Sequence, residues 1–423
     1  NLDHANEIME RWTSKPLLER DKKPVELIEF DRVFKKAKSE RYADIKEGGK
    51  EVERMLKDTN KMLRVSNASL DWHAYIDFIN NIVVDGLAGV ITVSLEFFLD
   101  QIDPEHIAEA SLLPMLEITL DLVEEGPRFT PRIGCTENGK GLRDISNNWV
   151  SSFFQVATLF KRLDCDGTYM REMHTDPDVC LLMAVIEDTQ DTNEKMLLEL
   201  RGQFDELSFL WTTDREVFFK EFTADALVET EHATYLDLAK YDTAITKYLD
   251  IAERVGRAKS PADVGWLRCN TQPIKDSLLD LSLVWKDMHT DYLRDHLVST
   301  LDRFDSFTIQ VEEGLAMAVD DGENVGNLRQ VMRDILETTK AELFTMDMFP
   351  PLKECLALLR HHQVDMGGEK IPSKGEVRRR EAKGKPDDWV PDGPPDLSKS
   401  KVVADYLDEA PMIWEGIVKT KYA

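Results

Sequence analysis

The segment from Pro273 to Phe304 reads PIKDSLLDLSLVWKDMHTDYLRDHLVSTLDRF, and its apolar residues recur at steps of three and four. Such steps place side chains on one face of an α-helix, and proline is favoured in the first helical turn. The segment therefore predicts a long helix that opens at Pro273. Its apolar face continues after one phase slip and comprises Ile274, Leu278, Leu281, Trp285, Met288, Tyr292, Leu297, Leu301 and Phe304.

The same periodicity predicts further helices along the chain. Between Leu142 and Leu163 the apolar face includes Trp149 at its middle. From Leu238 to Val255 the apolar residues form a heptad seam, which is typical of coiled-coil packing. Shorter helices are predicted at residues 328–343, 352–359 and 402–418, and the Phe349-Pro350-Pro351 break separates the first two.

One stretch has the period of a β-strand instead. Apolar and polar residues alternate from Leu116 to Leu122, the turn Glu124–Pro127 follows, and Phe129 and Ile133 come next. Alternation followed by a turn signal predicts a β-hairpin near residues 115–133.

The most apolar stretch runs from Phe78 to Leu99. Asp85 and Glu96 interrupt it, and the run between them is too short to cross a bilayer. We therefore expect a deeply buried helix in which Gly86 and Gly89 allow a neighbouring backbone to approach closely.

These patterns together predict a mainly α protein of elongated, tandem helical bundles with one small β-hairpin. A chain of 423 residues is long enough for two to four packed units. The predicted divisions are an N-terminal helical segment (1–70), a bundle containing the hairpin (71–210), a long-helix bundle (211–366), a flexible loop rich in proline and basic residues (367–400) and a final helix (401–423).

The composition restricts the classes of partner. The formal net charge is −27, so most of the surface repels nucleic acid and anionic lipid, and we predict neither as a partner. No signal peptide follows Asn1, and we expect the chain to be a segment of a longer intracellular protein. The cysteines are scattered without a CxxC pair, as expected of free thiols in a reducing compartment: Cys135, Cys165, Cys180, Cys269 and Cys355.

The strongest candidate for chemistry is the segment Gly134–Gly141, GCTENGKG, which resembles a phosphate-binding P-loop. Gly141 stands where a P-loop needs Ser or Thr to hold Mg²⁺, and Pro127 and Pro131 precede the segment in place of a buried parallel strand. We interpret it as a surface loop after the hairpin; a nucleotide-binding enzyme is the less favoured alternative.

Candidate metal sites fail for similar reasons. In Asp164–Gly167 the positions of a calcium loop would assign ligands to Arg162 and Met173, which cannot bind calcium. Cys165, His174 and Cys180 match no common zinc spacing. We expect His361 and His362 to be a solvated pair that weakly caps a helix, and the basic cluster from Arg378 to Lys385 to be a solvated loop. The chain is therefore predicted to hold no catalytic, cofactor-binding or metal-binding residues.

Several stretches resemble the tail of dynein heavy chains, and they occur in the same order. They are Trp72–Asp77 with Val84–Gly86 and Ser94–Leu99; Pro114–Ile118 with Phe129–Pro131; Gly141–Leu163; Leu210–Glu216 with Phe218; Trp266–Leu267, Pro273–Lys275 and Trp285; and Met348–Leu359. Leu210–Phe218 is the most specific, because it resembles the family signature YLWxxDRxEF. The resemblance covers the chain from about Trp72 onward, and residues 367–400 look like an insertion.

The resemblance implies a tail (stem) segment of an axonemal dynein heavy chain, with outer-arm character, just before the force-producing linker. The implied partners are other heavy chains, intermediate and light chains, and the docking complex on a doublet microtubule in the cilium or flagellum. ATP and Mg²⁺ would bind motor modules beyond Ala423, and this segment itself would not be an enzyme. A helical scaffold or tether unrelated to dynein is the alternative, although such proteins usually show a regular repeat.

Overall fold

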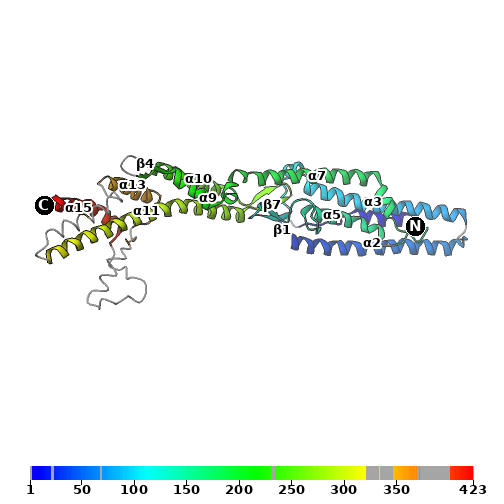
Figure 1. Ribbon diagram of the computed structural model, residues 1–423. Helices are drawn as coiled ribbons and strands as arrows, with labels where there is room; N and C mark the ends of the chain where they lie inside the picture. Colours follow the sequence, from blue (N-terminus) through cyan, green and yellow to red (C-terminus); the bar gives the residue numbers. More distant parts are fainter. Residues whose placement is uncertain are drawn as a thin grey trace, which may run out of the picture. The chain divides into compact units, whose positions relative to one another are not determined.

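The computed structural model describes residues 2–20, 23–66, 69–229, 234–320, 333, 346–366, 368, 371 and 401–422 (Figure 1). Helices predominate in these residues, so the prediction of a mainly α fold is confirmed. The α-helices are α1 (Leu2–Thr13), α2 (Leu27–Leu63), α3 (Leu70–Ile102), α4 (Pro104–Glu109), α5 (Leu142–Phe153), α6 (Met170–Thr175), α7 (Pro177–Gly202), α8 (Phe209–Thr212), α9 (Arg215–Asp225), α10 (Leu238–Arg257), α11 (Gln272–Asp320), α13 (Phe349–His361) and α15 (Val403–Tyr422).

The chain divides into two compact units. Unit 1 comprises residues 1–211 and 257–278, and unit 2 comprises residues 212–256 and 279–423. Unit 1 is therefore discontinuous in sequence, because the chain leaves it after Trp211 and re-enters at Arg257. The finer divisions expected at residues 70, 366 and 400 stay predictions.

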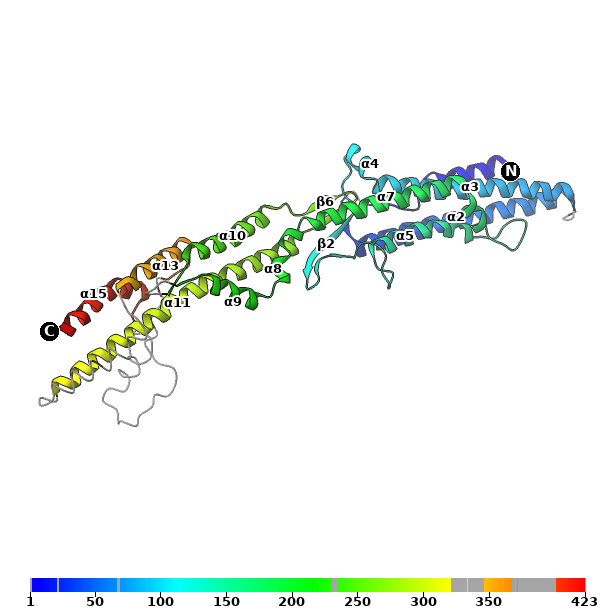
Figure 2. The same ribbon diagram turned by 45° about the horizontal axis from the view of Figure 1, so that its top comes forward.

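Helix α3 forms the centre of unit 1 and packs against α1 and α7 (Figures 1 and 2). Its length and hydropathy would also suit a membrane span, and 44% of its most apolar window is buried within the protein. A Cβ atom at Gly89 would lie 2.7 Å from Thr13 Cγ2, and one at Gly86 would overlap Met9. The predicted close approach at these two glycines is confirmed, and α1 is the element that approaches.

The predicted hairpin is confirmed but is part of a larger mixed sheet. Strand β2 (Leu116–Val123) pairs antiparallel with β3 (Gly126–Thr130), which ends before Ile133. β2 also pairs in parallel with β1 (Val25–Glu26) and β7 (Leu267–Asn270), and β7 pairs antiparallel with β6 (Ala262–Val264). The strands that enlarge the sheet were not predicted, because strands of two to four residues are too short to show a period of two.

The helix predicted at residues 142–163 is shorter than expected. α5 ends at Phe153, and the 3₁₀-helix η1 (Phe154–Thr158) follows. Phe153, Phe154 and Val156 are nonetheless buried, so the apolar pattern marked the core correctly. The pattern could not separate an α-helix from a 3₁₀ turn, because both place residues three apart on one side.

Unit 2 is built around α11, whose predicted start is confirmed: the helix begins at Gln272 with Pro273 in its first turn. The heptad residues Tyr241, Ile245 and Tyr248 of α10 are buried, as predicted. The remaining core comes from α13 and α15, and α13 opens with Pro350 and Pro351 in its first turn. The short strands β4 (Leu227–Glu229) and β5 (Thr234–Leu236) form a separate hairpin, and the 3₁₀-helices η2 (Asp205–Leu207) and η3 (Met346–Met348) complete the elements.

Two predictions fall outside the described residues: the helix at 328–343 and nearly all of the loop at 367–400. The backbone N–H of Ile371 donates to the carbonyl of Lys401 at 3.0 Å, so the residues on either side of 372–400 are hydrogen-bonded neighbours.

Candidate interaction groove

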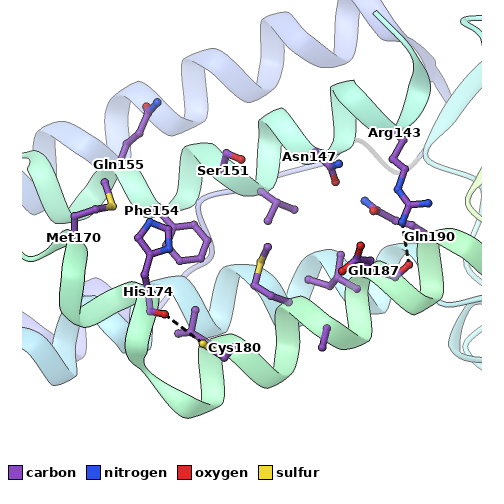
Figure 3. Close-up of a pocket in the computed structure, with 15 residues that line it drawn as sticks. Arg143, Asn147, Ser151, Phe154, Gln155, Met170, His174, Cys180, Glu187 and Gln190 are labelled. Atoms are coloured by element: carbon purple, nitrogen blue, oxygen red, sulfur yellow. Dashed lines mark hydrogen bonds between the residues drawn. The ribbon is translucent and has the colours of Figure 1, made fainter. Parts of the chain in front are cut away.

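Unit 1 contains a groove of about 950 Å³ between α5 and α7, hereafter the α5–α7 groove (Figure 3). Its floor is apolar, with Val150, Phe154 and Ile186 buried and Met183 half-buried. The wall formed by α5 and η1 carries a polar row spaced four residues apart: Asn147, Ser151 and Gln155. The groove thus has an apolar floor and a polar rim.

Helix α6 lies at one end of the groove. The imidazole of His174 stacks on the Phe154 ring with centroids 4.8 Å apart and an interplanar angle of 8°. The Cys180 thiol contacts the His174 carbonyl, with Sγ and O separated by 3.4 Å (Figure 3). Asp176 caps α7 here by accepting from the N–H groups of Asp178 and Val179, each at 3.0 Å.

The other end is closed by a charged cluster. Arg143 of α5 bonds Asp191 of α7 and lies 3.3 Å from Glu194. Its pKa is raised, chiefly by the hydrogen bond to Asp191. Beneath it the buried Gln190 side chain donates to Ser146 Oγ at 2.9 Å. These contacts fix α5 to α7, so the walls of the groove are held in place without an occupant.

Helix α7 also carries exposed apolar side chains among its exposed charged ones. Leu181 is 65% exposed and Val185 is 40% exposed. Cys180 and Ala184 are also exposed and lie on the groove side of the same helix. This arrangement suits the burial of another apolar helix face, because exposed apolar surface beside a groove is typical of interaction sites.

The P-loop-like segment has a different organisation from a phosphate cradle. The Asp144 carboxylate accepts from Thr136 N at 2.8 Å, Thr136 Oγ1 at 3.0 Å and Gly141 N at 3.0 Å. Thr136 Oγ1 in turn accepts from Lys140 N at 2.9 Å. The backbone bonds to Thr136 and Gly141 lower the pKa of Asp144, so the carboxylate stays ionised. The loop thus directs its donors to the carboxylate of Asp144. The preceding strand β3 is antiparallel to β2, whereas a P-loop follows a parallel strand.

The residues weighed as metal ligands are engaged elsewhere. Arg162 binds Asp164 at 2.8 Å and also pairs with Glu172, while Lys161 binds Asp166 at 2.8 Å. Within the described ranges, no three His, Cys, Asp or Glu side chains come together as a metal site. Cys165, His174 and Cys180 therefore do not form one cluster with a fourth ligand.

The expectation of a solvated His361–His362 pair was wrong for its second member. The His362 side chain is 4% exposed, and its Nε2 lies 2.7 Å from Asp242 Oδ1 of α10. A helix end can place one residue outward and the next inward, which adjacent sequence positions do not reveal. The basic cluster at residues 378–385 lies outside the described residues.

The α5–α7 groove was missed from the sequence. The exposed apolar residues of α7 at positions 181 and 185 lie outside the lining of the groove, so they were not a signal for it. Which helix faces α7 depends on tertiary packing, and no local pattern encodes it.

Comparison with curated proteins gives consistent relatives. The chain is 29% identical over 311 residues to the dynein beta chain of the flagellar outer arm of Chlamydomonas reinhardtii, covering 73% of this chain and 7% of that protein. It is 26% identical over 404 residues to human dynein axonemal heavy chain 17, covering 92% and 9%. It is 25% identical over 387 residues to the ciliary dynein beta chain of Heliocidaris crassispina, covering 87% and 8%. The matched segment is thus less than a tenth of each relative. No family model matches the chain.

Proposed function

Because the chain is homologous to axonemal dynein heavy chains over most of its length, we propose that it is a tail segment of such a heavy chain, lying just before the force-producing linker. The observation that carries this proposal is the extent of the match: 92% of the chain aligns with a single relative. The ordered motifs from Trp72 to Leu359 support the placement within the tail.

The proposed role is structural. The tail segment would hold heavy chains side by side, carry intermediate and light chains, and fix an outer dynein arm to the doublet microtubule of a cilium or flagellum through other subunits. The fold supports this role, because the described residues are largely helical and unit 1 presents the α5–α7 groove on its surface. The homology disfavours the alternative of a helical scaffold unrelated to dynein.

The test is made on isolated axonemes. An antibody raised against residues 1–211 should label the ciliary or flagellar axoneme, and the antigen should leave it in high-salt extracts together with outer-arm dynein. On a sucrose gradient the antigen should sediment with dynein heavy chains. An antigen found mainly in the cell body, or one that sediments apart from every dynein heavy chain, would contradict the proposal.

We also propose that this segment does not catalyse, and that ATP and Mg²⁺ act in other modules of the parent protein. The support is the loop at Gly134–Gly141, whose amide donors are bonded to Asp144 and Thr136. The chain should show no saturable binding of Mg·ATP in the micromolar range, and Lys140→Ala should leave the melting temperature unchanged. Saturable binding that is lost in Lys140→Ala would overturn this part of the account.

A further inference from the structure

We propose that the α5–α7 groove is a docking site for an amphipathic helix of another subunit, whose apolar stripe is flanked by lysine or arginine. This inference deepens the proposed scaffolding function and rests on it. The shape, the polarity and the charge of the groove all favour this one kind of occupant.

The shape of the groove suits a helix. One long wall is formed by α5 and η1 and the other by α7. On the first wall, Asn147 and Ser151 of α5 and Gln155 of η1 are eight positions apart from end to end, or about 12 Å at the rise of an α-helix. Arg143 lengthens the groove at one end, and Met170 lengthens it at the other. A helix of three to four turns therefore fits along it. The small side chains of Ser151 and Ala184 on opposite walls allow the backbone of the incoming helix to approach.

The polarity selects an amphipathic occupant. The floor formed by Val150, Phe154 and Ile186 would bury an apolar stripe. The polar row of Asn147, Ser151 and Gln155 would remain at the rim and bond to polar groups of the occupant.

The charge of the groove favours an occupant with basic side chains. Arg143 is already neutralised by Asp191 and Glu194. Glu187 also lines the groove on the α7 side, and its carboxylate has no ion-pair partner in the part of the chain that the structure describes. The whole chain carries a net charge of −27, so a second copy would bring like charges to this surface. A partner helix with Lys or Arg beside its apolar stripe complements the groove.

Cys180 allows a direct test, because its thiol is exposed and lines the groove, while Cys135 and Cys165 are exposed and lie outside its lining. The probe is a synthetic peptide of 15 residues, built from leucine, alanine and lysine with a single leucine stripe. The matched control peptide replaces every lysine with glutamate. The full chain is treated with N-ethylmaleimide, and the alkylation rate at each cysteine is followed by mass spectrometry.

Saturating lysine peptide should slow alkylation of Cys180 by about tenfold and leave Cys135 and Cys165 unchanged, because the helix covers only the groove. The glutamate peptide should protect much less. Equal protection by the two peptides, equal slowing at all three cysteines, or no protection of Cys180 up to millimolar lysine peptide would overturn the proposal.

Variants separate the contributions of shape and charge. Ala184→Trp places a large ring on an exposed groove wall and should weaken binding of the lysine peptide about tenfold or more, with an unchanged melting temperature. Glu187→Lys should weaken it about two- to fivefold, as expected for an exposed charge, and the effect should shrink in high salt. Glu199→Lys makes the same charge change on α7 outside the groove and should have no effect. If Glu199→Lys and Glu187→Lys weaken binding equally, the attraction is non-specific. Failure here would leave the co-sedimentation test of the dynein proposal unaffected, so the two proposals can fail separately.

Discussion

The helix contacts inside unit 1 and those inside unit 2 are of different kinds. In unit 1 the helices meet where glycine removes a side chain: a Cβ atom at Gly48 of α2 would lie 2.7 Å from Trp12 Nε1 and 2.9 Å from Ile8 Cγ2. In unit 2 the helices meet through aromatic rings that surround the fully buried His289 of α11. Ring centroids lie 4.7 Å away for Phe222, 5.3 Å for Phe219 and 5.6 Å for Tyr248.

The difference predicts different sensitivities. Unit 1 has no space for added volume at its helix contacts, because the partners of Gly48 are themselves fully buried core residues. Unit 2 has a polar group inside an apolar shell. His289 Nδ1 bonds the Trp285 carbonyl at 2.7 Å, and its Nε2 has no hydrogen-bond partner among the described residues. Added atoms at the helix contacts should therefore destabilise unit 1 more than unit 2. Added charge in the core should destabilise unit 2 more than unit 1.

The largest effect is expected where volume is removed, and it should be common to both units. Trp149 is 3% exposed and packs on Phe30 at a centroid distance of 4.6 Å; Trp285 is 1% exposed and packs on Phe218 at 5.2 Å. Trp149→Ala and Trp285→Ala should each lower the free energy of unfolding by about 3–5 kcal/mol. Urea denaturation measures this loss. A variant with an unchanged midpoint and lost partner binding would instead identify that tryptophan as an interface residue.

Added volume should distinguish the units. Gly48→Ala should destabilise unit 1 by about 1–2 kcal/mol, because the cost of overpacking exceeds the gain in helix propensity. Gly416→Ala is the matched change in unit 2: the position lies inside α15, and a Cβ there would meet nothing within 4 Å. This variant should stabilise the protein by about 0.5–1 kcal/mol. If both substitutions stabilise, the glycine contacts of unit 1 are looser than described here.

Protonation of a histidine should have opposite effects on the stability of the two units. Burial lowers the pKa of His289, so the unfolded chain binds its proton first on acidification, and stability is lost as the pH falls below about 6.5. The slope for one such group is at most about 1.4 kcal/mol per pH unit. In unit 1 the pKa of His4 is raised by its hydrogen bonds to Glu51 and then Glu7, so this contact strengthens below about pH 6.5 and weakens as the pH rises through the folded-state pKa.

The check is a set of urea melts between pH 7.5 and 5.5. His289→Phe should flatten the loss of stability on acidification, and His4→Gln should make that loss steeper. The same pH slope in wild type and His289→Phe would show that His289 does not resist protonation.

The smallest effect is expected inside unit 2, beside residues 372–400. Lys401 binds the buried Asp305 carboxylate at 2.7 Å and lies 4.5 Å from the centre of the Tyr406 ring. With Ile371 bonded to the Lys401 carbonyl, the ends of residues 372–400 already meet. Replacing residues 372–400 with a short Gly/Ser linker should change the free energy of unfolding by less than about 1 kcal/mol. Lys401→Ala in the same background is the contrasting variant and should cost more, since it leaves Asp305 buried without its cation. A replacement that unfolds α13 or α15 would show that residues 372–400 contribute to the core.

How much of this was predictable depends on the length of each element. The long apolar series of α10 and α11 and the alternation in β2 were sufficient to predict those elements. β1, β6 and β7 have four residues or fewer. β1 and β7 pair with β2 across about 90 and about 150 positions of the chain, as in Val25 with Leu116 and Leu116 with Leu267. No local pattern encodes such pairing. The groove depends on the same kind of information, because Asn147 and Glu187 become neighbours of one cavity only after α5 and α7 pack.

The central claim is that these 423 residues are part of a dynein heavy chain, and sequencing the full-length transcript that encodes them tests it most directly. The account predicts an open reading frame that continues downstream through a helical linker into several ATPase modules. The first of these should contain a complete GxxxxGK[ST] motif after an apolar strand, which is the context that Gly134–Gly141 lacks. A stop codon soon after Ala423, or several thousand further residues without one intact P-loop, would contradict the claim and leave a helical scaffold unrelated to dynein as the explanation.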